Sequence, residues 1–112
     1  MELSRNLQIA TAAVDSTGLC LFVAFAVLDK PEAFEAIYEM INAFYGLKLG
    51  ADDVVNLGKT VLTIEKKFNN AAGFTKADDR LPDWMRTEPL APHNSVFTVT
   101  DEDLDQVFNF VQ

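Results

Sequence analysis

The stretch 52–73, DDVVNLGKTVLTIEKKFNNAAG, has the most regular apolar pattern in the chain. Its apolar residues recur every three or four positions, at Val54, Leu57, Val61, Ile64 and Phe68. An α-helix has 3.6 residues per turn, so these side chains share one face, and the three lysines of the stretch fall outside it. Gly73 follows at a position where glycine commonly ends a helix. The pattern predicts an amphipathic helix from about residue 52 to just before Gly73.

Two helices are predicted closer to the N-terminus. The first has apolar residues at helical spacing, namely Leu3, Leu7, Ala10 and Val14. This spacing predicts an amphipathic helix that ends near Ala13. Further along, Asp29 and Glu32 have the spacing of a capping box, and Pro31 is tolerated in a first turn. A helix is therefore predicted to begin here and to stop at Gly46.

Between these two helices, residues 19–28 form an uninterrupted apolar run. Spanning a bilayer takes about 20 residues, so this shorter run predicts a buried helix instead. A secretory signal peptide is the alternative, favoured by Arg5 upstream and opposed by the long leader and by Asp15 just before the run.

The C-terminal part of the chain has a different character. Residues 75–99 hold three prolines and show no sustained periodicity, which indicates a long irregular segment of the kind that often covers a site. Trp84 and Met85 are expected to anchor it onto the helices. Thr100 and Asp103 can cap a short final helix. We therefore predict an all-α, multihelical single domain, 1–112, of about four to five helices with one long irregular segment.

Charge and cysteine content limit the environment and the partners. Seventeen acidic and nine basic side chains give a net charge of −8, which disfavours binding to nucleic acid and to anionic membranes. Cys20 is the only cysteine, and no Asn-x-Ser/Thr acceptor is present. A reducing cytoplasm is the expected location.

Three apparent motifs are better explained by ordinary structure. Gly58-Lys59-Thr60 resembles the end of a phosphate-binding loop, but Asp53 stands where that motif needs a glycine. The acidic clusters 78–79 and 101–105 lack the ligand spacing of a calcium loop and are interpreted as solvated caps and turns. His93 and Cys20 cannot complete a zinc site, which needs about four donors. A Cys-His nucleophile pair remains a third functional alternative.

Residues 15–20, DSTGLC, allow two interpretations. One is a capped helix start followed by a buried thiol. The other is a cofactor contact, in which Asp15 on a tight turn accepts paired hydrogen bonds from the amino and ring nitrogens of a pterin, and Gly18 lets the backbone approach closely. Cys20 near a helix N-terminus would then have a stabilised thiolate, the form that ligates iron.

The same six residues resemble the Asp-x-x-Gly-Leu-Cys motif near the C-terminal end of aldehyde:ferredoxin oxidoreductases. The resemblance covers most of residues 15–90. After the motif, further stretches match the family in its order and approximate spacing, namely Asn56-Leu57-Gly58, 64–69, Gly73, Asp78-Asp79, Leu81-Pro82 and Glu88-Pro89-Leu90. The sequence departs from the family at Lys59-Thr60, where Glu-Arg is usual. It also departs at the end, 108–112, where the family has a Tyr-rich segment and Arg-Gly-Trp-Asp.

The resemblance implies a tungsten-bis-pterin and a four-iron four-sulfur cluster in the full-length protein. In its terms Asp15, Gly18, Leu19 and Cys20 form a cofactor-binding motif, with Cys20 as the last of four cluster ligands. The resemblance further implies that the full-length enzyme oxidises an aldehyde to a carboxylic acid and passes electrons through the cluster to ferredoxin. Because one cysteine cannot hold the cluster, the chain is interpreted as a C-terminal domain fragment that depends on the remainder of the enzyme.

The isolated fragment is accordingly expected to be inactive and to hold neither tungsten nor a stable cluster. Within the parent, residues 75–99 are expected to line the entrance to the site. The main alternative from another functional class is a small acidic helical interaction module without a cofactor, in which Cys20 belongs to the core.

Overall fold

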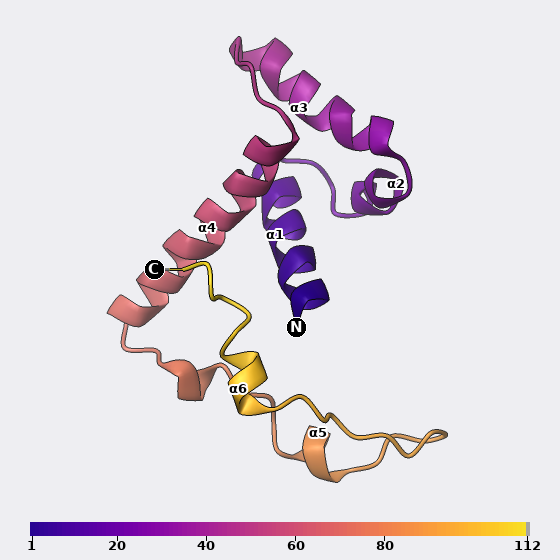
Figure 1. The fold of residues 1–112 in the computed structure, drawn as a ribbon, viewed down its shortest axis with the longest axis vertical. Helices are drawn as coiled ribbons and strands as arrows, with labels where there is room; N and C mark the ends of the chain where they lie inside the picture. Colours follow the sequence, from indigo (N-terminus) through magenta and orange to yellow (C-terminus); the bar gives the residue numbers. More distant parts are fainter. Residues whose placement is uncertain (112) are drawn as a thin grey trace.

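A computed structural model describes residues 1–111, apart from the side chain of Leu28 (Figure 1). Within these residues no β-strand forms, and one isolated antiparallel bridge joins Leu90 to Ser95. The all-α prediction is therefore confirmed. The α-helices are α1 (Glu2–Ser16), α2 (Val23–Asp29), α3 (Pro31–Tyr45), α4 (Ala51–Ala71), α5 (Trp84–Thr87) and α6 (Asp101–Leu104), with a 3-10 turn, η1 (Lys76–Asp78). None of the helices in the described part of the chain is long and apolar enough to cross a membrane.

Helices α1 and α4 lie side by side and supply most of the core (Figure 1). The buried apolar side chains are Ile9, Ala13, Val14, Ile37, Val54 and Val107. Gly58 is also buried, and a Cβ built there would stand 2.0 Å from the carbonyl oxygen of Ile9. The predicted stripe of α4 is only partly covered, because Ile64 and Phe68 remain 62% and 72% exposed. The N-terminal half of α4 thus contributes to the core, whereas the last two residues of the stripe are exposed.

Helix α1 is longer than the predicted segment, which ended near Ala13. It continues to Ser16, whose hydroxyl donates to the Ala12 carbonyl at 2.6 Å. Gly18 then takes the left-handed conformation with φ of +77°. The polar residues 15–18 therefore end the preceding helix, whereas the sequence predicted that they would cap the following one.

The apolar run 19–28 does not form the buried helix that was predicted. Helix α2 begins at Val23, and Leu21, Phe22 and Phe25 are 51%, 79% and 67% exposed. The prediction was wrong because, among the described residues, α2 packs chiefly on α3, which leaves the side of the run that carries these three residues exposed.

Helix α3 ends where the sequence predicted, at Gly46, which adopts φ of +68°. Pro31 occupies the start of α3 as expected, but Lys30 is the N-cap and its side chain makes no capping bond, so the capping box of Asp29 and Glu32 is absent. The turn into α4 is fixed by the side chain of Asn42, which donates to the Leu49 carbonyl at 2.9 Å and accepts from the Leu49 N–H at 2.7 Å.

The long segment after α4 is largely irregular, as predicted, but ion pairs hold it in place. Arg80 donates to Asp105 at 2.8 Å, Arg86 donates to Asp101 at 2.6 Å, and Lys66 pairs with Asp79. The acidic clusters were interpreted as solvated caps and turns. Three of their six carboxylates, Asp79, Asp101 and Asp105, instead pair with basic side chains. The capping role applies to Asp78 in η1 and Asp103 in α6, and Glu102 is exposed.

The two ends of the chain are joined by Arg5. Its guanidinium donates to the Val107 carbonyl at 2.9 Å and to the Gln106 carbonyl at 2.6 Å. The Thr100 hydroxyl caps α6 as predicted, by accepting from the Asp103 N–H at 3.1 Å. Trp84 does not anchor the loop as expected, since 53% of it is exposed.

The chain forms a thin slab with extents of 51 × 39 × 19 Å. Its radius of gyration is 17.1 Å, whereas a compact chain of this length has about 13 Å. A compact monomer of 12.4 kDa exposes about 6,100 Å² of surface, and this chain exposes 8263 Å². Much of its apolar surface is therefore left uncovered by its own residues.

Candidate functional site

The turn that carries the Asp15–Cys20 motif is fixed by hydrogen bonds to the backbone carbonyls of α1. The Gly18 N–H donates to the Asp15 carbonyl at 3.1 Å, and the Thr17 hydroxyl donates to the Val14 carbonyl at 2.6 Å. Asp15 itself lies in the last turn of α1 with its side chain exposed. Glycine suits the left-handed position at 18 because it has no Cβ to clash with the following carbonyl. The turn thus holds an acidic side chain outward on a defined backbone.

Asp15 lines a hollow of about 550 Å³ that lies between α1 and α4. Its lining residues are Leu7, Gln8, Thr11, Ala12, Asp15, Ser16, Val61, Leu62 and Glu65. Two carboxylates, from Asp15 and Glu65, therefore belong to one otherwise largely neutral depression. Ionised carboxylates only accept hydrogen bonds, so the hollow suits a group that presents N–H donors or positive charge.

Leu19 belongs to a second hollow of about 360 Å³, between the motif and α3. The other residues that line it are Thr17, Ile37, Met40, Ile41, Phe44 and Tyr45. Leu19 is half-buried there, which fixes the connection between α1 and α2 against α3. Asp15 and Ser16 line the first hollow and Thr17 and Leu19 line the second, so the motif contributes to both.

Cys20 is an exposed free thiol. Its carbonyl accepts from the Val23 N–H at 2.9 Å at the start of α2. The interpretation of Cys20 as a buried core thiol is therefore wrong. The sulfur is open to a ligand or metal from outside the chain, while the backbone around it is held by the following helix.

The described residues do not bring together a complete metal site. Within residues 1–111 no group of three or more His, Cys, Asp and Glu side chains could hold a metal ion. His93 is exposed in a loop that Figure 1 draws well away from the connection between α1 and α2. A Cys20-His93 nucleophile pair is therefore not assembled. Gly58-Lys59-Thr60 lies inside α4, where no phosphate loop can form.

Sequence reasoning missed the contribution of α4 to the Asp15 hollow. Glu65 and Val61 are one helical turn apart, so the sequence places them on one side of α4. Nothing in the sequence, however, shows that this side faces Asp15. The relation follows from the packing of α1 on α4, which depends on the close contact at Gly58.

Residues 1–111 match the family described as "Aldehyde ferredoxin oxidoreductase, domains 2 & 3". The chain belongs to this family. The tungsten-containing aldehyde ferredoxin oxidoreductase of Pyrococcus furiosus is 33% identical over 84 residues, which are 74% of this chain and 13% of that protein. The proteins of the same description from Pyrococcus horikoshii and Thermococcus kodakarensis are each 31% identical over the same shares. No solved structure matches the chain.

This family member thus spans only 13% of the length of the curated relatives it matches. The residues of its motif fit one side of a cofactor site. Asp15 supplies an exposed hydrogen-bond acceptor and Cys20 supplies an exposed thiol, the group that ligates iron-sulfur clusters. A cluster needs about four such ligands, so Cys20, the one cysteine of the sequence, could supply only one of them.

Proposed function

We propose that the chain forms one wall of the cofactor site of a tungsten-pterin aldehyde:ferredoxin oxidoreductase and is inactive alone. The observation that carries the proposal is the exposure of Asp15 and Cys20 on one rigid turn of a chain that belongs to this family.

Each motif residue has a distinct task in this proposal. The Asp15 carboxylate accepts hydrogen bonds from the amino and ring nitrogens of a pterin, which orients the ring. Gly18 keeps the backbone free of a side chain next to it. Leu19 holds the turn against α3, and Cys20 supplies one of four thiolates to an iron-sulfur cluster.

The cofactors, when bound, supply the oxidation of an aldehyde and water to a carboxylic acid, with two electrons passing to ferredoxin and two protons released. This chain contributes positioning. It places a pterin acceptor and a cluster ligand five residues apart, so that both cofactors are fixed relative to one backbone segment. The cluster requires a reduced thiol, which fits a reducing cytoplasm.

Metal analysis of the native assembly tests the proposal. The longer enzyme or complex that contains this chain is purified anaerobically through a tag on the chain and analysed for tungsten, iron and acid-labile sulfide. We expect all three, together with aldehyde-dependent reduction of ferredoxin. An assembly that holds neither tungsten nor iron would support the interaction module without a cofactor and contradict the proposal.

A further inference from the structure

An apolar hollow of about 370 Å³ is lined by residues of α1, α2, α3 and α4. Its walls include four buried side chains of the core, Ile9, Ala13, Val14 and Val54. Sites for small organic ligands are typically of this size and largely apolar, with a few polar groups that fix the orientation of the ligand. Neither Asp15 nor Cys20 lines this hollow, so the proposed cofactor contacts do not account for it.

Lys59 is the one charged residue among those that line the apolar hollow. It is half-buried, and among the described residues its ammonium group forms no ion pair. Lys66, Lys76, Arg80 and Arg86 all pair with carboxylates instead. A positive charge that is partly withdrawn from water is stabilised by a nearby anion. Lys59 therefore favours a ligand that brings a negative charge to the hollow.

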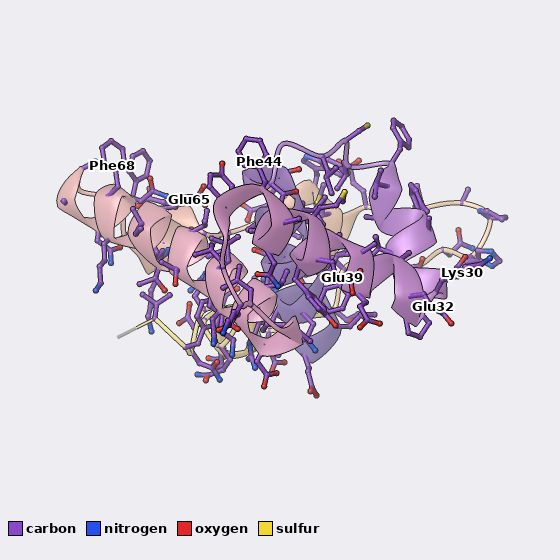
Figure 2. All side chains as sticks on the ribbon, turned by 90° about the horizontal axis from the view of Figure 1, so that it is seen from above. Lys30, Glu32, Glu39, Phe44, Glu65 and Phe68 are labelled. Carbon is purple, nitrogen blue, oxygen red and sulfur yellow. The ribbon has the colours of Figure 1, made fainter. Side chains whose placement is uncertain are left out.

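Lys59 also lines a second, more polar hollow of about 450 Å³ on α4, together with Lys67, Thr60 and Thr63. No acidic residue is among those that line either hollow. Glu65, which Figure 2 shows pointing to the side of the molecule that carries Phe68, lines neither of them. The positive charge at Lys59, where the apolar and polar hollows share a residue, is thus not balanced by the lining residues.

We propose that the apolar hollow binds an amphipathic monocarboxylate, with its hydrocarbon chain among the core residues and its carboxylate on the Lys59 ammonium group. One ammonium group balances one carboxylate, whereas a phosphate monoester carries about two negative charges. Lys67, the other lysine nearby, is about 12 Å further along the helix axis, which favours the singly charged ligand. This site goes beyond the proposed function and does not depend on it.

Lysine acetylation with mass spectrometry tests the site in the native assembly that contains this chain. Octanoate is the probe, because it combines an apolar chain with one carboxylate. At a concentration about ten times its Kd, octanoate should slow the acetylation of Lys59 about tenfold. Octanol lacks the charge and acetate lacks the chain, so each should protect Lys59 much less. Lys48, which is exposed and lines neither hollow, should react equally in all samples.

The variant Lys59→Met provides a second measurement. Methionine keeps an unbranched apolar side chain at position 59 and removes the charge, so the circular dichroism of the assembly should not change. The affinity for octanoate, measured by calorimetry, should fall about tenfold or more because the charge-assisted contact is lost. Lys48→Met removes an exposed lysine elsewhere and should leave the affinity unchanged.

Three results would overturn the monocarboxylate site. The first is that octanol or acetate protects Lys59 as well as octanoate does, since either the charge or the chain would then be irrelevant. The second is an unchanged affinity for octanoate in Lys59→Met. The third is a Lys59 that does not react in the native assembly even without octanoate, because another part of the assembly would then cover it.

Discussion

Gly58 of α4 lies against the backbone of Ile9 in α1 without room for a single methyl group. A Cβ at position 58 would stand 2.0 Å from the Ile9 carbonyl oxygen and 2.9 Å from its carbonyl carbon. Both clashing atoms belong to the backbone, so a side-chain rotation cannot relieve the clash. The approach of α1 to α4 is therefore set by this glycine.

The variant Gly58→Ala should push the two helices apart. Alanine gains up to about 1 kcal/mol of helix propensity over glycine, but overpacking against backbone costs about 1–3 kcal/mol. We expect a net loss of stability, measured by urea denaturation. Gly50→Ser is the control, because a Cβ there meets nothing within 4 Å and serine is favoured at the N-cap of α4. Equal stability of Gly58→Ala and wild type would contradict the close contact.

Substitutions of Cys20 distinguish between its two possible roles, a cluster ligand and a structural thiol. Because Cys20 is exposed, Cys20→Ser and Cys20→Ala should each change the free energy of unfolding by no more than about 0.5 kcal/mol. Both should lower the iron and acid-labile sulfide of the native assembly, since serine is a poor iron ligand. Ser16→Ala, an exposed residue of the same turn, should retain full iron content. Normal iron in both Cys20 variants would remove this residue from the site.

Asp15→Asn should affect the pterin more than the cluster. The substitution keeps the shape of the side chain but replaces one acceptor oxygen with a donor and removes the charge that favours the N–H groups of a pterin. Tungsten retention in the native assembly should fall while iron stays closer to its normal content. Asp29→Asn removes an exposed charge at the end of α2 and should leave both metals unchanged. Equal losses of tungsten in Asp15→Asn and Asp29→Asn would indicate a general effect of the removed charge and would contradict a specific pterin contact at Asp15.

The contact between Arg80 and Asp105 should depend on pH. The hydrogen bond from Arg80, with the charges of Arg80 and Lys76, lowers the pKa of Asp105 from its ordinary value of 3.8. A lowered pKa means that the contact stabilises the fold above the ordinary pKa, and that this stabilisation is lost as the pH falls through the folded value. The protection factors of the amides of residues 101–107, which compare the observed exchange rate with the intrinsic rate at each pH, should therefore fall in acid.

Asp105→Asn should remove this acid dependence, because the amide does not titrate in that range. Glu102→Gln removes a neighbouring exposed charge on α6 and should preserve the dependence. If the amide protection factors of Asp105→Asn and wild type depend on pH in the same way, a titrating group other than Asp105 holds the C-terminal segment in place.

The parts of the fold that depend on short-range signals were predicted from the sequence. Gly46 ends α3 in the left-handed conformation, and α4 spans the predicted stretch, because periodicity and helix-ending glycines act within a few residues. Burial was predicted less well. The sequence marked Phe25 and Phe68 as apolar residues that should be covered, but a pattern does not show whether the cover belongs to the same chain.

Long-range relationships were missed for a different reason. Arg80 and Asp105 are 25 residues apart, and no local pattern pairs a loop arginine with one aspartate of an acidic cluster. The same difference between local and long-range signals applies to the candidate site. The turn that carries Asp15 and Cys20 was recognised from six adjacent residues, but the presence of Glu65 in the Asp15 hollow depends on how α1 packs on α4.

The 19 Å thickness of the slab affects how the chain can evolve. In a thicker domain, apolar residues are retained because their own core requires them. Here Phe44 and Phe68 contribute little to the stability of the isolated chain, because most of each side chain is exposed. Substitutions at these two positions should therefore change its free energy of unfolding by no more than about 0.5 kcal/mol, so selection for folding of this chain alone would not preserve them.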